Sequence, residues 1–491
     1  MIATAPDQSL GLLTDLYQLT MAAGYWKTGI AEREVVFPLV FRENPFGGGY
    51  SVACGLETAL DFLARFRFAG DDLDYLAGLT GNDGRPLFEP AFLDYLSALE
   101  LTCDLDAVPE GTVVFPHEPL VRVRGPLAQC QILETSLLTI VNFQTLIATK
   151  AARVCQAAGE HGVIEFGLRR SQGVDGGMSA GRAAYVGGCV GTSNVLAGKR
   201  YGIPIMGTHA HSWVMSFPSE SESFMAWARA LPNNCVFLVD TYDTARGVDN
   251  AIAAGRWLRE RGHEMMGVRL DSGDLGALSR EARRQLDEAG FPDAKIVASS
   301  DLDEHAIAAL EASGAPIDLY GVGTRLATAY DQPALGGVYK LAAWRDGGVW
   351  RHVIKLSEEK VKVSNPGVHQ VRRFSGRDGG FLADVVYDEV SGISRPCTWF
   401  DAEDREHDAP ADAESEDLLV PVLRRGRRVY DVPEISAVRR RTLAQLAGLP
   451  EGVRRLDEPD GYAVGLDRNL YGIKEELIAE LRARTASSSV R

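Results

Sequence analysis

Paired cysteines, long apolar runs and basic charge are all scarce in this chain. The seven cysteines are scattered singly with no C-x-x-C pair, so neither a disulfide framework nor a zinc site of paired thiolates is expected. No apolar run is long enough to span a bilayer, and no basic segment followed by an apolar core opens the chain. We therefore expect a cytoplasmic location, reduced thiols and no membrane partner.

The deficit of basic charge restricts the possible partners further. Lysine and arginine number 51 against 67 acidic residues, which gives a formal net charge of −16. A general nucleic-acid partner is therefore not expected. An anionic substrate needs a local basic pocket instead, and the candidates for it are Arg169, Arg170, Arg269 and Arg325.

A β-α rhythm occupies the middle of the chain. Apolar runs that end in polar residues cover 163–166, 203–206, 236–239, 266–270, 296–298 and 319–322. Helical patterns follow at 244–261, 278–289 and 303–313. This alternation predicts a parallel α/β barrel whose strands gather their polar carboxyl ends on one face. The alternative is that these polar residues are only the N-caps of the following helices.

The two ends of the chain predict a mixed α/β structure. A helix capped by Thr14 is expected near the start, followed by strand-like segments. Near the other end, 401–417 is acidic and contains proline, which predicts an exposed loop, and 473–484 predicts an amphipathic helix.

His211 is the sharpest candidate for chemistry. It follows the apolar run 203–206 and lies near the hydroxyls of Thr208 and Ser212, with His209 two positions earlier. An H-x-H pair is compatible with a shared metal ion, although no third ligand is evident. A structural histidine and a reactive imidazole are the other two interpretations, and we favour the reactive one because histidine titrates near neutral pH.

Two further strand ends carry polar clusters. The segment 269–274 combines Arg269 with Asp271 and Asp274, which can hold sugar hydroxyls or Mg²⁺ or stabilise a developing sugar cation. The alternative is a structural Arg–Asp pair with Asp274 as a helix cap. Gly323 and Thr324 suit a phosphate at a helix N-terminus, or else form a tight turn required by packing.

The motifs together resemble those of the nicotinate phosphoribosyltransferase family, a group of type II phosphoribosyltransferases. The resemblance covers most of the chain. The matching segments are 14–21 (TDLYQLTM), 44–49 (NPFGGG), 143–150 (FQTLIATK), 166–170 (FGLRR), 207–212 (GTHAHS), 269–274 (RLDSGD) and 321–324 (GVGT).

The resemblance implies an irregular TIM-like α/β barrel with a second α/β lobe formed by the N- and C-terminal segments. On this basis 1–140 is expected to be an N-terminal α/β lobe and 141–335 the barrel with the active site. The segment 336–491 is expected to complete the lobe and the periphery of the barrel. The resemblance also implies a homodimer with shared active sites.

The implied reaction joins nicotinate and phosphoribosyl pyrophosphate to give nicotinate mononucleotide and pyrophosphate in NAD biosynthesis. ATP is the implied co-substrate through a phosphohistidine at His211, Mg²⁺ is expected to accompany the pyrophosphate, and its protein ligands are unassigned. Asp271 would assist the transition state. The residues implied to bind substrate are Tyr17 and Phe166 around the pyridine ring, Arg169, Thr208 and Arg269 in the pocket, and Gly323 and Thr324 at the phosphate.

Several alternatives remain open from the sequence. Nicotinamide phosphoribosyltransferase has the same expected fold and a neutral substrate, and a non-catalytic ligand-binding barrel would lack one of the key residues. An aldolase-type barrel would need a lysine at a strand end, and no strand end has one. Lys150 and Arg153 are compatible with a phosphate contact or with a helix surface.

Overall fold

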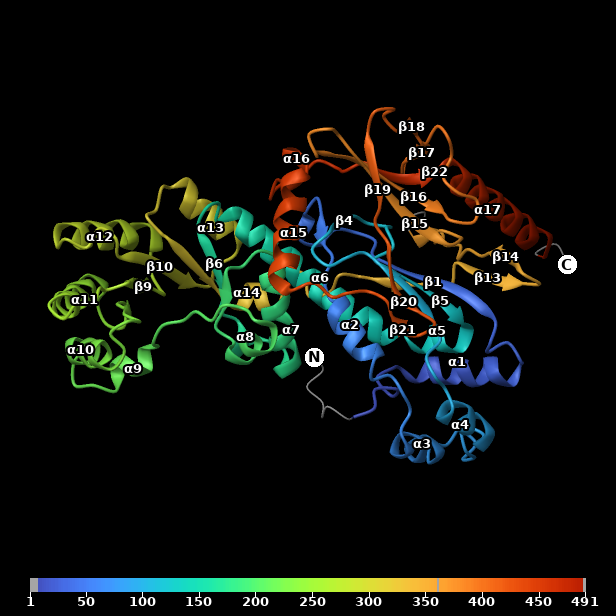
Figure 1. Ribbon diagram of the computed structural model, residues 1–491, viewed down its shortest axis with the longest axis horizontal. Coiled ribbons are helices and arrows are strands. Elements are labelled where there is room, and N and C mark those ends of the chain that lie inside the picture. Colours follow the sequence, from blue (N-terminus) through green and yellow to red (C-terminus); the bar gives the residue numbers. More distant parts are fainter. Residues whose placement is uncertain (1–7, 360–361, 489–491) are drawn as a thin grey trace. The chain divides into compact units, whose positions relative to one another are not determined.

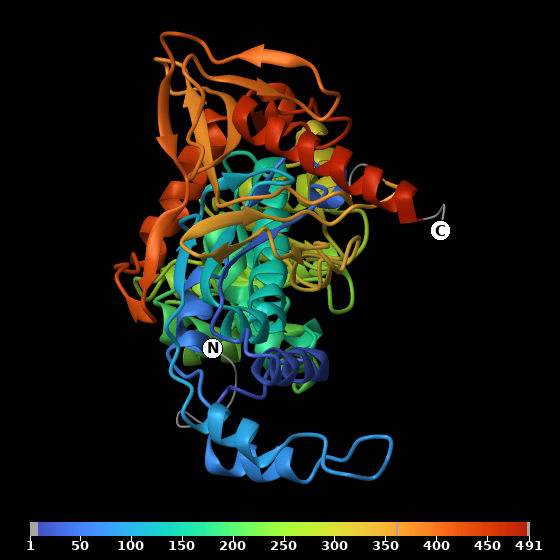
Figure 2. The ribbon, with the colours of Figure 1, turned by 90° about the vertical axis from the view of Figure 1, so that its right-hand side faces the viewer.

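The computed structural model describes residues 8–359 and 362–488 and divides into two compact units. Unit 1 comprises Met1–Leu146 and Ala334–Arg491, so it contains both ends of the chain, and unit 2 is Ile147–Pro333. The boundary between unit 1 and unit 2 after Leu146 falls within the long helix α6, Glu134–Ala157. Figures 1 and 2 show the ribbon of both units.

Unit 2 is built on a six-stranded parallel sheet with the order β7-β6-β11-β10-β9-β8. Its strands are β6 (Gly162–Glu165), β7 (Gly191–Thr192), β8 (Val236–Leu238), β9 (Gly267–Leu270), β10 (Lys295–Ser300) and β11 (Leu319–Val322). These strands are mostly apolar and buried, as expected for a sheet covered on both faces. The sheet confirms the predicted α/β class.

Helices follow the strands of unit 2 as the rhythm predicted. They are η2 (Leu168–Arg170), α7 (Gly173–Val186), α8 (Val195–Tyr201), α9 (His211–Met215), α10 (Glu220–Ala230), α11 (Thr244–Arg259), α12 (Leu275–Glu288), α13 (Glu304–Ala312) and α14 (Thr324–Ala327). Asp243, Asp274 and Asp303 each accept a hydrogen bond from the first turn of the helix that follows. In Figure 1, α11 and α12 lie along the outer side of β9 and β10.

The expected closed barrel is not found among the described residues. The six strands form an open sheet, since the strands at its two edges, β7 and β8, do not pair with each other. The strand expected at 203–206 reduces to one bridge between Ile205 and Thr192. Pro204 lacks an N–H group and Gly202 has a positive φ of 72°, so this segment cannot extend a regular ladder.

Unit 1 contains two larger sheets and one two-stranded sheet. The first sheet has the order β14-β13-β1-β5-β3-β20-β21 with β12 beside β1, the second has the order β18-β17-β22-β16-β15-β19, and β2 pairs with β4. The strands of the first sheet are β1 (Glu34–Val40), β3 (Asp104–Ala107), β5 (Val121–Pro126), β12 (Val338–Tyr339), β13 (Ala343–Asp346), β14 (Val349–His352), β20 (Val420–Arg424) and β21 (Arg427–Arg428). The others are β2 (Ser51–Val52), β4 (Val113–Val114), β15 (His369–Ser375), β16 (Phe381–Asp388), β17 (Thr398–Phe400), β18 (Glu406–Asp408), β19 (Glu414–Asp417) and β22 (Val464–Asp467).

The helices of unit 1 come from both chain ends. They are α1 (Leu16–Lys27), η1 (Pro45–Gly47), α2 (Leu56–Leu63), α3 (Gly70–Ala77), α4 (Pro90–Ser97), α5 (Leu127–Ile132), α15 (Ile435–Gly448), α16 (Glu451–Arg454) and α17 (Arg468–Ser488). Figure 2 shows α3 and α4 projecting from the rest of this unit. Helix α17 covers the predicted helical segment near the C-terminus and packs on β16, β17 and β22.

One local prediction in unit 1 is wrong and another is wrong in part. Asp15 occupies the N-cap position of α1, while the hydroxyl of Thr14 donates to the carbonyl of Ile132. The acidic segment 401–417 is largely exposed as predicted, but part of it forms the strands β18 and β19 instead of a loop, because backbone pairing with β17 and β15 outweighs its local composition. In residues 8–359 and 362–488, no helix has the length and hydropathy needed to cross a bilayer.

Candidate functional site

The polar residues that follow the strands of unit 2 form one connected hydrogen-bond network. Its centre is Asp271, which lies just after β9. Asp271 Oδ1 accepts from Arg269 Nη2 at 2.7 Å and from Ser299 Oγ at 2.5 Å. Burial raises the pKa of the Asp271 carboxyl, but the Ser299 hydroxyl and the Arg269 charge outweigh it, so its pKa lies below the ordinary value. Asp271 is therefore a carboxylate at neutral pH.

Arg269 connects three strand ends through its guanidinium. Its Nε donates to Ser299 Oγ at 2.7 Å and its Nη1 donates to Thr208 Oγ1 at 3.1 Å. The guanidinium carbon lies 5.4 Å from the centroid of the Phe166 ring, within the range of a cation–π interaction. The structure therefore brings together four predicted site residues, namely Phe166, Thr208, Arg269 and Asp271.

His211 joins the same network as the first residue of α9. Its Nδ1 lies 3.1 Å from Thr241 Oγ1, and its Nε2 lies 3.6 Å from Asp271 Oδ2. Two polar groups thus face opposite nitrogens of one half-exposed ring. This arrangement can select one tautomer of the neutral ring, as a nucleophilic histidine requires.

His209 has a structural role in this fold. It is 4% exposed, and its Nε2 accepts the backbone N–H of Leu238 at 3.3 Å. Its ring packs among Phe224, Trp227 and Phe237. Burial lowers the pKa of His209 to about 4, so the ring is neutral at pH 7. Because the side chain is committed to this core, the shared-metal interpretation of the H-x-H pair is not supported.

Asp240 is a member of the network that the sequence did not single out. Its Oδ2 accepts from the N–H of Asp271 at 2.8 Å and from Ser272 Oγ at 2.6 Å. Its Oδ1 is buried and has no hydrogen-bond partner. A free carboxylate oxygen is the kind of ligand that Mg²⁺ takes from a protein when substrate phosphates and waters supply the rest. No group of three or more His, Cys, Asp and Glu residues in the described part of the chain is arranged as a metal cage.

Phe166 and the Gly323 loop pack directly against each other. The N–H of Phe166 donates to the carbonyl of Val322 at 2.8 Å. A Cβ at Gly321 would lie 2.6 Å from the Phe166 ring, and a Cβ at Gly167 would overlap Ala327 and approach the carbonyl of Gly323. These glycines are therefore required for close approach of the two loops. Thr324 opens the one-turn helix α14, whose first N–H groups have no acceptor within the helix.

The other cations considered from the sequence have different environments. Arg169 and Arg170 are exposed on η2 and can face solvent or a ligand. Arg325 instead lies 3.5 Å from Asp301 and 3.3 Å from both Asp303 and Asp331. Three carboxylates therefore match its charge, so it does not supply excess positive charge for an anion.

Lys150 and Arg153 are buried and do not lie on an exposed helix surface. Both are 1% exposed, and both contact Glu304, Lys150 at 2.5 Å and Arg153 at 2.9 Å. Lys150 also contacts Asp331 at 2.6 Å. These residues form a buried ionic network in unit 2. Asp274 likewise has the structural role considered from the sequence, because its side chain caps α12.

Tyr17 lies on α1 in unit 1 and is 47% exposed. Partial burial and the negative charge of Glu134 raise the pKa of its hydroxyl to about 12, so the ring is an uncharged phenol at pH 7. Its neighbours Leu13, Leu16 and Met21 are also exposed. The aromatic face of this helix is therefore accessible within its own unit.

Unit 1 also contains a cationic cleft that the sequence did not reveal. It encloses about 540 Å³, its open mouth included. The cations and histidines that line it are Arg42, Lys340, Lys355, Lys362, His117 and His369. Burial lowers the pKa of His117 and of His369 to about 4 in each case. The positive charge at neutral pH therefore comes from the arginine and the lysines, and such a set favours phosphate groups.

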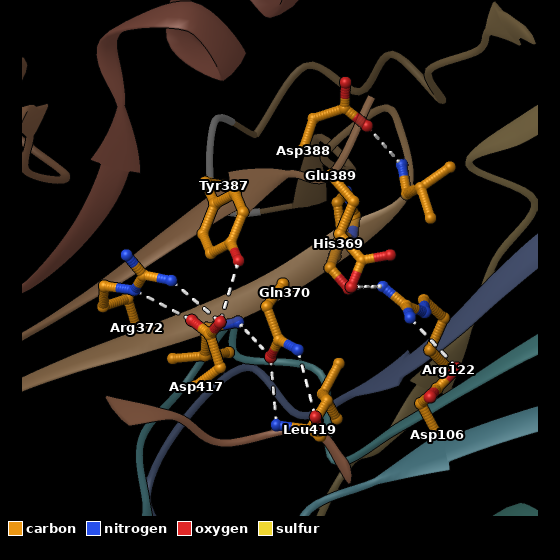
Figure 3. Close-up of polar contacts among 12 residues, drawn as sticks. Asp106, Arg122, His369, Gln370, Arg372, Tyr387, Asp388, Glu389, Asp417 and Leu419 are labelled. Carbon is orange, nitrogen blue, oxygen red and sulfur yellow. Dashed lines mark hydrogen bonds and ion pairs between the residues drawn. The ribbon is translucent and has the colours of Figure 1, made fainter. Parts of the chain in front are cut away.

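Ionic and polar contacts fix the floor of this cleft around His369 (Figure 3). The carbonyl of His369 accepts from Arg122, which also contacts Asp106 and Glu389 at 3.0 Å each. The amide of Gln370 holds the backbone of Leu419 through two hydrogen bonds. These contacts join β15 to β5 of the first sheet and to Leu419, next to β20.

The fold and the network define an α/β protein with a small-molecule site at the carboxyl ends of parallel strands. Comparison with known families narrows this class. The N-terminal domain model of nicotinate phosphoribosyltransferase matches residues 12–142, the family model matches 162–362, and the C-terminal domain model matches 368–474.

Similar proteins support the same assignment. Nicotinate phosphoribosyltransferase of Bacillus subtilis is 44% identical over 97% of each chain, and the human one is 36% identical over 95% of this chain and 96% of its own. The crystal structure of human nicotinic acid phosphoribosyltransferase superposes with a TM-score of 0.82, 33% identity and coverage of 94% and 99%. A nicotinate-nucleotide pyrophosphorylase from Pyrococcus furiosus shares the fold, with a TM-score of 0.67 and 22% identity over 91% of this chain and 97% of its own. The chain belongs to the nicotinate phosphoribosyltransferase family.

Proposed function

We propose that the protein joins nicotinate and phosphoribosyl pyrophosphate to give nicotinate mononucleotide and pyrophosphate in NAD biosynthesis. The observation that carries this proposal is the network of His211, Arg269 and Asp271 at the carboxyl ends of the unit 2 strands. Family membership and the likeness to the human enzyme support it. The network supplies a fixed carboxylate, a fixed cation and an imidazole within one site.

The roles of the site residues follow from their chemistry. The ribose carbon gains positive charge as pyrophosphate leaves, and the Asp271 carboxylate can stabilise that charge. We place the pyridine ring of nicotinate between two aromatic side chains, Phe166 of one chain and Tyr17 of the second chain of a homodimer. Arg169, Thr208 and Arg269 provide the cations and the hydroxyl that a carboxylate substrate favours.

We further propose that ATP hydrolysis is coupled to transfer through phosphorylation of His211. Asp271 faces Nε2, so it favours the tautomer with its proton on that nitrogen and leaves the Nδ1 lone pair for attack on the γ-phosphorus of ATP. The new N–P bond replaces the bond between the γ-phosphorus and the β,γ-bridging oxygen, and ADP leaves. The phosphorylated ring would then carry negative charge beside Asp271 and Thr241. This local change of charge can alter the affinity for substrate.

The phosphate groups have two candidate positions. The glycines and backbone N–H groups at Gly323 and Thr324 suit the 5′-phosphate, and the cationic cleft of unit 1 suits a separate phosphate-bearing ligand. Mg²⁺ would be held by Asp240 through its free Oδ1 and would neutralise charge on the leaving pyrophosphate.

Three further expectations belong to this proposal. The six-stranded parallel sheet of unit 2 supports an irregular barrel opened between its edge strands β7 and β8. The exposed apolar face of α1 supports a homodimer in which two chains share active sites. A cytoplasmic location is compatible with seven free cysteines.

The test is a transfer assay with nicotinate or nicotinamide, with and without ATP, on the wild type, His211→Ala and His161→Ala. His161 is a surface histidine paired with Glu311 and serves as the control. We expect nicotinate mononucleotide formation that ATP stimulates, with stimulation lost only in His211→Ala. Product from nicotinamide alone would assign the sister activity, and no product from either base would refute the proposed reaction. Equal ATP stimulation in His211→Ala would remove the phosphohistidine.

A further inference from the structure

Glu165 is a buried acid that immediately precedes Phe166 in the chain, and the proposed reaction gives it no role. It is the last residue of β6 and is 1% exposed. Burial raises the pKa of its carboxyl, while hydrogen bonds from Thr192 and Gly167 act in the opposite direction. A buried acid without such partners would be strongly destabilising, so the contacts of Glu165 indicate why it is tolerated.

The two carboxylate oxygens of Glu165 have separate partners. Oε2 accepts from the hydroxyl of Thr192 at 2.6 Å, and Oε1 accepts from the backbone N–H of Gly167. Glu165 and Thr192 are paired across β6 and β7, and Thr192 is fully buried. Thr192 Oγ1 in turn accepts from the N–H of Asn194 at 3.0 Å. The Glu165 carboxylate therefore connects β7, through Thr192, to the Phe166–Gly167 turn that follows β6.

That turn carries the aromatic residue of the proposed nicotinate site. Gly167 lies between Phe166 and η2, which bears Arg169. Its Cα is packed so tightly that an added Cβ would meet Ala327, the carbonyl of Gly323 and Glu165 Oε1. A shift of the turn would therefore move the Phe166 ring and disturb the Gly323 loop together.

We infer that Glu165 and Thr192 are a positioning pair that fixes the Phe166–Gly167 turn and thereby sets the affinity for the pyridine substrate. The inference rests on the proposed function for the identity of that substrate. Glu165 and Thr192 do not touch the reacting atoms in this role. They hold the ring-binding turn in one conformation, which lowers the cost of ordering it when substrate binds.

The test uses two variants that disturb the pair from opposite sides. Thr192→Val keeps the side-chain shape but removes the hydroxyl, and Glu165→Gln keeps the Thr192–Asn194 bond but replaces one acceptor oxygen by a donor. In each we expect the KM for nicotinate to rise about tenfold, as for one hydrogen bond to a charged group, with kcat changed less than about threefold. Thr192→Ser retains the hydroxyl and is expected to restore KM to within about twofold of wild type.

Thr442→Val is the matched control, because Thr442 is equally buried but lies on α15 in unit 1. It should leave the KM for nicotinate unchanged. Amide hydrogen exchange gives a second readout that is independent of activity. We expect residues 166–171 to exchange about tenfold faster in Thr192→Val than in the wild type or in Thr442→Val.

The outcomes separate this inference from the proposed function. An active wild type with unchanged KM and unchanged exchange at 166–171 in both variants would overturn the positioning pair. A fall in kcat with constant KM would also overturn it, since that result indicates a role in the chemical step. An inactive wild type would refute the proposed reaction, while faster exchange in Thr192→Val would still support the structural part of the inference.

Discussion

Positive charge is paired with carboxylates at the candidate site of unit 2 but is in excess in the cleft of unit 1. In unit 2, Arg269 is neutralised by Asp271, and Arg325 lies near three carboxylates. In the cleft of unit 1, cations outnumber their partners. Lys340 and Lys362 have carboxylates at 3.8 Å and 2.5 Å, while Arg42 and Lys355 have no ion pair among the described residues.

This difference matches two kinds of chemical work. Charges that are fixed by one another in advance can stabilise a transition state without reorganising. An excess of cations attracts anionic ligands and helps to overcome the field of a chain with a net charge of −16. We therefore assign orientation and catalysis to the paired network and phosphate attraction to the cleft, and four predictions test this contrast.

The largest expected effect is on the stability of unit 2. Lys150→Met leaves the buried carboxylate of Glu304 and the carboxylate of Asp331 with one partner fewer. We expect the free energy of unfolding in urea to fall by about 3–5 kcal/mol, as for other broken buried ion pairs. Lys295→Met is the control, since its pair with Asp318 is on the surface, and it should cost less than about 1 kcal/mol. Equal losses would contradict the structural role of Lys150.

The second prediction concerns the fixed geometry of the active network. Arg269→Lys keeps the charge but cannot reach Ser299, Thr208 and Asp271 together. We expect kcat/KM to fall about 10²- to 10³-fold, as for the loss of one fixed donor in other active sites. Arg284→Lys on the surface of α12 should leave kcat/KM unchanged. If Arg269→Lys kept most of its activity, charge rather than geometry would be what this site requires.

The third prediction concerns the pH dependence of unit 1. Burial raises the pKa of Asp388, but His352 and the N–H groups of Val368 and Ser391 outweigh it and bring the pKa down to about 2. A lowered folded-state pKa stabilises the protein above the ordinary value of 3.8, and this contribution of about 2 kcal/mol is lost as the pH falls from 3.8 to 2.

Unfolding curves of the wild type and Asp388→Asn between pH 6 and about pH 2 measure this contribution. We expect the difference in unfolding free energy between them to shrink toward acid pH. Asp346→Asn is the exposed control and should show a constant small difference. A constant difference for Asp388→Asn as well would show that His352 and the backbone do not hold the carboxylate in its charged form.

The smallest expected effect belongs to the cleft. Lys355→Gln removes one cation, and we expect the Kd for inorganic pyrophosphate at the cleft to rise about tenfold, with stability nearly unchanged. The dependence of that Kd on salt concentration should weaken too, because salt screens the attraction between the cleft cations and the ligand. Lys27→Gln removes the same charge from an exposed helix end and should change neither quantity. An unchanged Kd in Lys355→Gln would show that the cleft does not bind phosphate groups.

The local pattern of the sequence was sufficient for much of unit 2. The alternation of apolar runs and helical segments predicted β6, β8, β9, β10 and β11, because these strands are apolar along their length and end in polar residues. It failed at 203–206, where Pro204 prevents a ladder, and it missed β7, whose two residues leave no periodic signal. The acidic strands β18 and β19 were missed because their pairing is decided by distant partners.

The candidate site shows the same division. His211 and Asp271 could be named from the chain because they follow apolar runs, and Arg269 because it is a charged residue near the end of one, where parallel strands expose side chains. The sequence by itself thus determined most of the strand ends of unit 2, the cap at Asp274 and the family, because each leaves a signal in short stretches of sequence. Only the tertiary structure decided that Ser299, Thr241 and Asp240 complete the network, that His209 and Lys150 are buried partners, and that four distant cations form one cleft. These outcomes depend on contacts between segments far apart in the chain, which local periodicity does not encode.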